Sequence, residues 1–114
     1  MDILAIQQTH IKETKVTELE EYVLFTSGGK SRYRVGFLVS KELKKKIAKF
    51  EPISDKMCRI ELQGETNLSI LNIHAPTEEK PKEVKEEFYE KLENEYNKQN
   101  KRSVKIIMGD MNNA

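Results

Sequence analysis

Short apolar runs separated by polar connections dominate the chain, and most of these runs have the length and composition of β-strands. Strands are expected at residues 3–6, 22–26, 35–39, 58–62 and 68–74, and in the apolar run that begins at 104 and leads into Gly109-Asp110-Met111-Asn112. The second and third runs flank a loop with two glycines, and the fourth and fifth flank the turn sequence Gly-Glu-Thr-Asn, so each pair is expected to form a β-hairpin. The first run, Ile-Leu-Ala-Ile, is unbroken, which is typical of a strand buried on both faces.

Helical spacing indicates one long helix and one short helix. In the long helix, expected over 82–97, apolar residues recur at every fourth position and are expected to face the core. The short helix is expected within 42–50, and Pro52 is expected to end it. The apolar residues are Val84, Phe88, Leu92 and Tyr96 in the long helix, and Leu43, Ile47 and Phe50 in the short one.

The long helix lies between two expected strands, one at 68–74 and one in the apolar run that begins at 104. A strand, a helix and a second strand joined by short connections form a crossover unit, in which the two strands are parallel neighbours. His74 ends the first of these strands and Asp110 ends the second. Their side chains are therefore expected at the same edge of one sheet.

Composition and charge narrow the function classes. The 114 residues allow one domain, and 20 basic against 19 acidic side chains leave a formal charge of +1, which excludes a global field that attracts nucleic acid or membranes. The single cysteine, Cys58, excludes an internal disulfide and is expected to be a buried structural thiol rather than a nucleophile. Neither a membrane-spanning segment nor a signal peptide is recognisable, so we expect an intracellular protein, in the nucleus or cytoplasm, without a membrane partner.

Polar side chains follow three of the expected strands. They lie in Gln7-Gln8-Thr9, in Asn72-Ile73-His74-Ala75-Pro76-Thr77 and in Gly109-Asp110-Met111-Asn112. Each segment has an ordinary structural explanation, because Gly-Asp-x-Asn is typical of a turn and a single histidine commonly makes structural hydrogen bonds. The order of the three segments along the chain favours a functional site more than any one segment does by itself.

In their order along the chain, these segments resemble the endonuclease/exonuclease/phosphatase superfamily, and more narrowly its craniofacial development protein 2-like branch and the endonuclease domains of non-LTR retrotransposons. The resemblance includes Ser-Gly-Gly-Lys at 27–30 and Gly-Phe-Leu-Val-Ser at 36–40, and it extends over nearly the whole chain. It implies a DNase I-like fold, which is a four-layered α/β sandwich with mostly antiparallel, mixed sheets and one long helix. Residues 1–114 would then be a single, incomplete domain that lacks the family's first strand and C-terminal half.

The resemblance also implies a divalent-metal site, with Mg²⁺ as the expected cofactor, and hydrolysis of phosphodiester bonds, often in DNA. Carried over by position, Asp110 orients the attacking water and contributes to metal binding, Asn112 donates hydrogen bonds to the phosphate, and His74 contacts a phosphate oxygen. Where the family has a glutamate that holds the metal, this chain has Gln8, which is expected to weaken Mg²⁺ binding severely. The family's distal aspartate and histidine are also missing, so the isolated chain is expected to be catalytically silent.

Basic residues in the glycine-bearing loop are candidate substrate-binding groups. Arg32 and Arg34 flank Tyr33, a pattern in which cations follow a nucleic-acid backbone while the ring stacks on a base. A solvated loop, with its charge offset by Glu42 and Glu51, is the favoured interpretation of the same residues.

Two further functions stay open. One is a noncatalytic module that binds nucleic acid through this loop or a protein partner through an exposed sheet, because half of a two-sheet sandwich leaves apolar faces or unpaired edges in water. The other is a gene-model fragment of an active nuclease.

Overall fold

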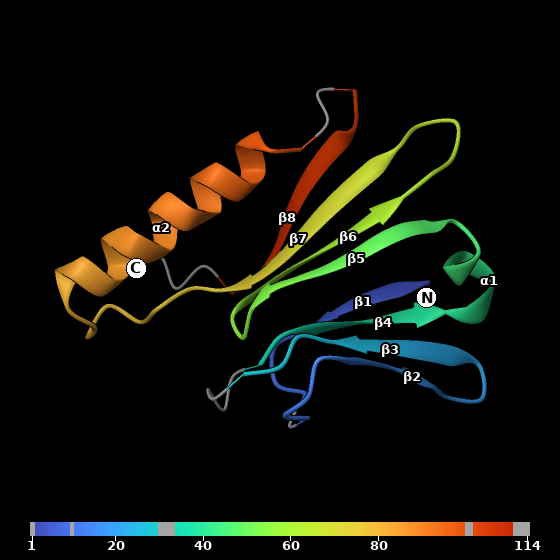
Figure 1. The fold of residues 1–114 in the computed structure, drawn as a ribbon, viewed down its shortest axis with the longest axis horizontal. Helices are drawn as coiled ribbons and strands as arrows, with labels where there is room; N and C mark the ends of the chain where they lie inside the picture. The colour runs from blue at the N-terminus through green and yellow to red at the C-terminus, as the bar shows by residue number, and fades with distance from the viewer. Residues whose placement is uncertain (1, 10, 30–33, 100–101, 111–114) are drawn as a thin grey trace.

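The computed structural model describes residues 2–9, 11–29, 34–99 and 102–110, which form two four-stranded β-sheets and two helices (Figure 1). In chain order the elements are β1 (Ile3–Ile6), β2 (Lys15–Glu18), β3 (Tyr22–Thr26), β4 (Gly36–Ser40), α1 (Lys41–Lys44), β5 (Ile47–Ser54), β6 (Met57–Leu62), β7 (Leu68–His74), α2 (Lys82–Asn97) and β8 (Val104–Asp110). Sheet A has the strand order β1-β4-β3-β2, and sheet B has the order β5-β6-β7-β8. An α/β protein with one long helix is therefore confirmed.

Sheet A is antiparallel throughout and is built around the expected hairpin of β3 and β4, in which Phe25 pairs with Phe37. These strands are rich in β-branched and aromatic residues, which pack well on a pleated surface. β1 adds to β4 on one side, and β2 adds to β3 on the other, with Val16 opposite Phe25. The sequence does not predict β2, because Lys-Val-Thr-Glu has only one apolar residue.

Sheet B combines an antiparallel meander with one parallel pair. β6 and β7 form the second expected hairpin, and β5 pairs with β6. β8 lies parallel to β7, and α2 connects the two strands. The predicted crossover unit is confirmed, so the carboxyl ends of β7 and β8 lie at the same edge of sheet B.

The main core lies between the two sheets, because alternate residues of each sheet point inward. Its buried members are Val23, Phe25, Val35, Phe37, Val39, Cys58, Ile60, Leu62 and Ile70. A second cluster, Met57, Leu71, Ile73 and Leu92, lies between the other face of sheet B and α2. Sheet A, sheet B and α2 therefore form three successive layers (Figure 1).

The cysteine has the structural role that the sequence predicts. Cys58 has no exposed surface and packs in the main core. Burial raises the pKa of its thiol well above the ordinary value, because the thiolate would lose its hydration. A thiol that stays protonated is a poor nucleophile.

The helix expected within 42–50 is wrong over most of its length. α1 covers only Lys41–Lys44, and strand β5 begins at Ile47. Ile47 and Phe50 both pack against the main core although they are three residues apart, because a register shift between Ile47 and Lys49 changes the alternation of the strand. Pro52 does not end a helix but lies inside β5, an edge strand where a missing N–H is tolerated.

The long helix has the expected bounds, but its apolar stripe meets sheet B only in the middle. A step of four residues turns about 400° around a helix, so each step drifts by about 40° from the starting face. Leu92 is buried, whereas Val84 and Tyr96 are 44% and 37% exposed. Within the described residues, neither helix is long and apolar enough to cross a lipid bilayer.

A buried ion cluster connects α2 to sheet B. Arg59 on β6 is 4% exposed, and its Nη2 donates to the backbone oxygen of Glu95 at 2.5 Å and to its carboxylate at 3.1 Å. Its Nη1 donates to Glu51 on β5 at 2.7 Å. Burial alone would raise the pKa of Glu95, but the hydrogen bond from Lys98 and the charge of Arg59 outweigh it, and the pKa lies below the ordinary value.

β1 forms as expected but is not buried on both faces. It is an edge strand of sheet A, and only its inward residues, Ile3 and Ala5, pack against the main core. Leu4 points away from the core and is 43% exposed.

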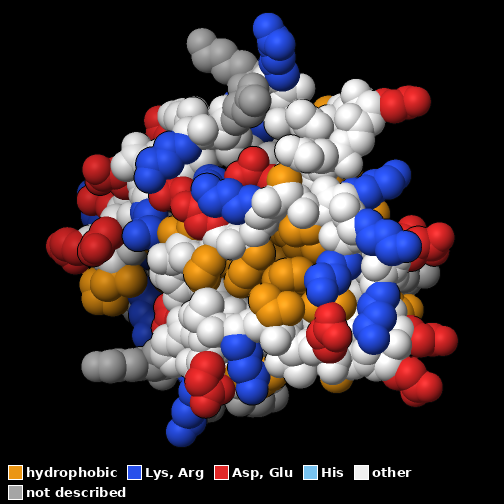
Figure 2. Space-filling model, turned by 45° about the vertical axis from the view of Figure 1, so that its right-hand side comes forward, with side chains coloured by type: hydrophobic (Ala, Val, Ile, Leu, Met, Phe, Trp, Pro, Cys, Tyr) orange, Lys and Arg blue, Asp and Glu red, His pale blue; other side chains and the backbone are white. Residues whose placement is uncertain are grey.

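Hydrophobic side chains also gather at the surface. Figure 2 shows a cluster of them in the middle of one face, bordered by lysine, arginine and acidic side chains. The large apolar residues with the most exposure in the described part of the chain are Leu4, Val16, Leu19, Val84, Tyr96, Val104, Ile106 and Ile107. Three of the eight belong to β8, which agrees with the expectation of an exposed sheet edge.

Candidate functional site

Strand ends from both sheets meet at one end of the molecule. Within the parallel pair, His74 at the end of β7 lies opposite Asp110 at the end of β8. The backbone N–H of Ala75 donates to the carbonyl of Asp110 at 2.8 Å, which continues the pairing past the strand end. Gln7, which follows β1 in sheet A, reaches the same place with its side chain. The expected juxtaposition of His74 and Asp110 is confirmed, whereas their catalytic roles stay predictions.

A chain of side-chain hydrogen bonds joins the two sheets at this end. Asn72, fully buried on β7, donates from Nδ2 to the backbone carbonyls of Ile6 at 3.0 Å and Gly36 at 2.8 Å. Its Oδ1 accepts a hydrogen bond from Nε2 of Gln7 at 2.6 Å. Oε1 of Gln7 lies 3.0 Å from Nδ1 of His74. We call Gln7, Asn72, His74 and Asp110 the polar cluster.

Gly109 provides the space in which the polar cluster forms. Its φ is +110°, a backbone conformation that residues with a side chain rarely adopt. A Cβ atom there would lie 2.1 Å from the carbonyl of Ile73 and 2.8 Å from both Oδ1 of Asn72 and Nε2 of Gln7. The glycine in Gly-Asp is therefore required by packing at the cluster and not only by turn geometry.

The environment of His74 favours its neutral form. Partial burial lowers the pKa of the imidazole from its ordinary value, because the imidazolium would lose hydration. The negative charge of Asp110 acts in the opposite direction, and the positive charge of Lys56 adds to the lowering. The backbone N–H of His74 donates to the carbonyl of Lys56 at 2.9 Å, which fixes the main chain of β7 here.

The other predicted site residues are placed differently. Asp110 and Gln8 are both exposed at the surface. Arg34 is 7% exposed, and its Nη1 donates to the carbonyl of Gly29 at 3.2 Å, so its guanidinium packs against protein. Asn112, Arg32 and Tyr33 lie outside the described residues.

Sequence reasoning did not select two of the four cluster residues, Gln7 and Asn72. Both had a signal. Alternation along β1 turns Ile3 and Ala5 inward, and the same period turns Gln7 inward and Gln8 outward. Asn72 interrupts the apolar sequence Leu-Ser-Ile-Leu-Asn-Ile, and a buried amide inside a strand needs hydrogen-bond partners.

The side chains at this end of the molecule provide few ligands for Mg²⁺. Gln8 is neutral and exposed, and both polar atoms of the Gln7 side chain already contact Asn72 and His74. The part of the chain that the structure describes contains no group of three or more His, Cys, Asp or Glu side chains placed to share a metal ion. Mg²⁺ usually requires carboxylate ligands, and of the side chains in the polar cluster only Asp110 supplies one, so these residues fit the ion poorly.

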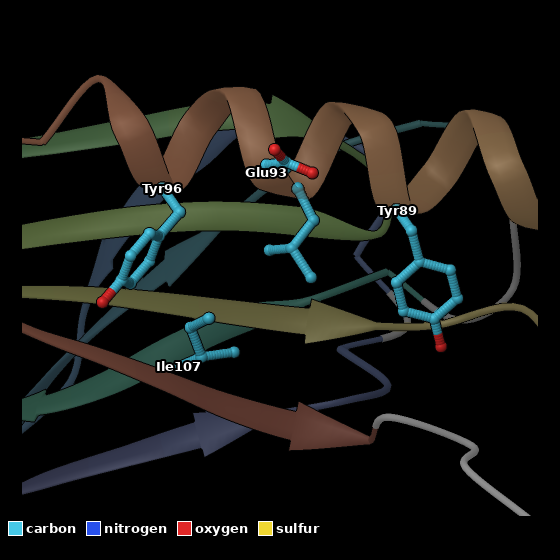
Figure 3. A pocket seen from close by; sticks show the side chains of 5 residues that line it. Tyr89, Glu93, Tyr96 and Ile107 are labelled. Atoms are coloured by element: carbon cyan, nitrogen blue, oxygen red, sulfur yellow. The ribbon is translucent and has the colours of Figure 1, made fainter.

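A separate apolar groove lies between α2 and β8. It has a volume of about 390 Å³ and is lined by Tyr89, Leu92, Glu93, Tyr96 and Ile107. Figure 3 shows the tyrosine rings hanging from α2 on either side of the groove, with Ile107 rising from β8 below them. The groove shares no residue with the polar cluster.

Comparisons with known proteins add no family to this description. No protein-family model matches the chain, and no curated protein matches it with significant similarity.

Proposed function

We propose that the chain is a DNase I-like domain related to the endonuclease/exonuclease/phosphatase superfamily, and that its polar cluster binds a phosphodiester group of nucleic acid without cleaving it efficiently. The observation that carries this proposal is the meeting of β1, β7 and β8 from two sheets, with His74 opposite Asp110 and hydrogen-bonded to Gln7. Three segments far apart in the sequence contribute polar side chains to one place. That order of segments is the one on which the family resemblance rests.

The chemistry of the cluster supports phosphate binding. An imidazolium donates a charge-assisted hydrogen bond to a phosphate oxygen, and such bonds are among the stronger ones in proteins. A carboxylate such as Asp110 accepts a hydrogen bond from a water molecule and polarises it. Because burial lowers the pKa of His74, phosphate binding through the imidazolium is expected to strengthen as the pH falls below 6.5.

Gln8, next to the polar cluster in sequence, and Asp110 within it support the proposal of catalytic silence. Gln8 replaces the family's metal-binding glutamate with an uncharged amide, and Asp110 alone gives one negative charge to a cation. Phosphodiester hydrolysis by this chemistry depends on a cation to stabilise the charge that develops on the phosphate. Binding without efficient turnover is therefore the expected outcome.

A nicking assay tests the silence. Supercoiled plasmid incubated with the purified chain and Mg²⁺ or Mn²⁺ is expected to stay supercoiled. Nicking above background that disappears in Asp110→Ala, but persists in the matched variant Asp2→Ala, would contradict the proposal. Asp2 is also an exposed aspartate, so it controls for the loss of one surface charge.

An anisotropy measurement with a fluorescent oligonucleotide tests the binding. His74→Ala is expected to weaken binding by about tenfold or more at a pH below the lowered pKa of the imidazole, since a hydrogen bond to a charged group contributes roughly 1.5 to 3 kcal/mol. Gln63→Ala, an exposed change in the turn between β6 and β7, is expected to have no effect. Equal affinities for the chain and its His74→Ala variant would exclude the polar cluster as the phosphate site.

The replacement at position 8 has its own test. Gln8→Glu is expected to tighten Mn²⁺ binding, measured by calorimetry, because it adds a carboxylate to the end of the molecule that holds Asp110. It is not expected to start nicking. An unchanged Mn²⁺ affinity would place residue 8 outside any metal site.

A noncatalytic protein-binding module is the second candidate. The exposed side chains of Val104, Ile106 and Ile107 on an edge strand favour it, because such a strand presents unpaired backbone groups beside apolar surface. The sedimentation behaviour of the chain, with and without an added charge on β8, tests this candidate.

A further inference from the structure

The hydrogen bonds of the polar cluster can each be assigned a direction. Asn72 places its Nδ2 3.0 Å from the carbonyl of Ile6 and 2.8 Å from that of Gly36. A carbonyl oxygen only accepts, so the group that faces these two atoms must be the amide NH₂. With the side chain flipped, Oδ1 would face two other oxygens. Oδ1 of Asn72 therefore points at Gln7.

The orientation of the Asn72 amide fixes that of the Gln7 amide. Oδ1 of Asn72 lies 2.6 Å from Gln7, so Gln7 presents its NH₂ there as the donor. The oxygen of the same amide, Oε1, then faces Nδ1 of His74 at 3.0 Å. Oε1 only accepts, so a hydrogen bond over this distance requires a proton on Nδ1.

We propose that Gln7 is a positioning residue that holds neutral His74 in its Nδ1–H tautomer, so that Nε2 carries the lone pair. Histidine in water prefers the Nε2–H tautomer. In this chain the backbone carbonyls of Ile6 and Gly36 orient the amide of Asn72, which orients the amide of Gln7, and the Gln7 oxygen selects the Nδ1–H tautomer. The consequence for the site rests on the proposed function. Neutral His74 accepts a hydrogen bond at Nε2 from a water, a hydroxyl or a protonated phosphate, and it donates there to a phosphate oxygen only as imidazolium.

The assignment uses fixed atoms of both sheets rather than the conformation of one loop. Asn72 lies within β7 and has no exposed surface, and the two carbonyls belong to the paired residues at the end of β1 and the start of β4. Gly109 leaves room for the two amides to meet. Each amide has one orientation that avoids oxygen facing oxygen, so the network specifies a single tautomer.

Long-range ¹H–¹⁵N NMR of the ring nitrogens tests the tautomer directly in the ligand-free chain, at a pH where the ring is neutral. His74 is expected to show a protonated Nδ1 and an unprotonated Nε2, with its signals identified by their loss in His74→Gln. An unprotonated Nδ1 would overturn the proposal. This NMR measurement requires neither phosphate binding nor nicking, so its outcome is independent of the proposed function.

Variants test whether Gln7 is responsible. Gln7→Met has a similar length but no hydrogen-bond donor and only a weakly accepting thioether, and it is expected to abolish the Nδ1–H signature. Gln8→Met, the same change at the neighbouring exposed glutamine, is expected to leave it intact. If Gln7→Met does not fold, Gln7→Asn supplies the comparison, because its amide is one methylene too short to reach both partners. An unchanged tautomer in the folded variant would exclude Gln7 as the positioning residue.

Discussion

At the scale of single residues, the polar cluster depends on Asn72 and Gly109, neither of which has a side chain that titrates. Asn72 has no exposed surface, and a buried amide is costly unless its polar atoms are hydrogen-bonded. Its two donors bind sheet A and its acceptor binds Gln7, so this amide helps to hold the two sheets in register. Gly109 makes the arrangement possible by leaving the space empty.

Substitution of Gly109 is expected to destabilise the fold. Gly109→Ala places a methyl group 2.1 Å from the carbonyl of Ile73 at a φ of +110°, and backbone strain of this kind costs roughly 1 to 3 kcal/mol before the clash with Gln7 is added. The free energy of unfolding in urea measures the loss. Gly64→Ala is the matched control, because its Cβ meets only the carbonyl of Thr66 at an ordinary 3.7 Å. Equal stabilities of the two variants would contradict the packing role.

His74 is expected to make stability depend on pH. Burial lowers its pKa in the folded chain below the ordinary 6.5, so the unfolded chain binds the proton more tightly. The contribution of neutral His74 to the free energy of unfolding is then fully present above about pH 6.5, and it is lost as the pH falls through the pKa of the folded chain. His74→Gln, which has no titrating ring, is expected to flatten this part of the profile of unfolding free energy against pH. His10→Gln is the control for the other histidine, and an unchanged slope in His74→Gln would refute the assignment.

The sequence predicted one half of the cluster and not the other for a physical reason. His74 and Asp110 follow from a crossover unit, whose parallel strands bring their carboxyl ends together regardless of register details. The choice between Gln7 and Gln8 depends on which face of β1 lies inward, and one residue of shift reverses that face. The sequence alone did not distinguish the two faces, because all four residues of β1 are apolar.

At the scale of elements, the strands and the long helix were predictable because their patterns extend over several periods. The segment 42–50 was not, because Leu43, Ile47 and Phe50 fit a helix, while a β-bulge lets a strand place two residues three apart on the same face. In α2, strict four-residue spacing predicted a longer contact with sheet B than a helix of 3.6 residues per turn can make. In both segments, packing against the rest of the fold decides the outcome where the local spacing of apolar residues does not.

The attachment of α2 is expected to depend on Arg59. Arg59→Met removes the buried cation that joins Glu95 to Glu51 and leaves the carboxylate of Glu95 with Lys98 as a cationic partner, so the loss is expected to lie at or below the roughly 3 to 5 kcal/mol that breaking a buried ion pair costs. Urea unfolding followed by circular dichroism measures the change. The double variant with Glu95→Met is expected to recover part of it. Lys82→Met, which breaks the exposed pair with Glu86, is expected to leave the midpoint nearly unchanged, and a similar value for Arg59→Met would show that the cluster is not stabilising.

At the scale of the whole molecule, the four edge strands differ in how well they are protected against pairing with another chain. β1 and β2 have four residues each, and β2 carries charges at both ends. β5 contains a proline, a lysine and two register shifts. β8 has seven residues, of which one is a lysine, the last is an aspartate and the other five are uncharged. Since charge, proline, bulges and shortness are the usual protections, β8 is the exposed edge most prone to association.

A charge on β8 is therefore expected to reduce self-association. Val104→Lys adds a cation to the edge at a residue that is 47% exposed, where the folded state tolerates it. Sedimentation velocity over a range of concentrations is expected to show a smaller associated fraction than in the unchanged chain. Val16→Lys makes the same substitution at 51% exposure on β2, so it controls for net charge. Only Val104→Lys alters the unprotected edge. If both variants reduce self-association equally, the reduction comes from the added net charge and not from the edge of β8.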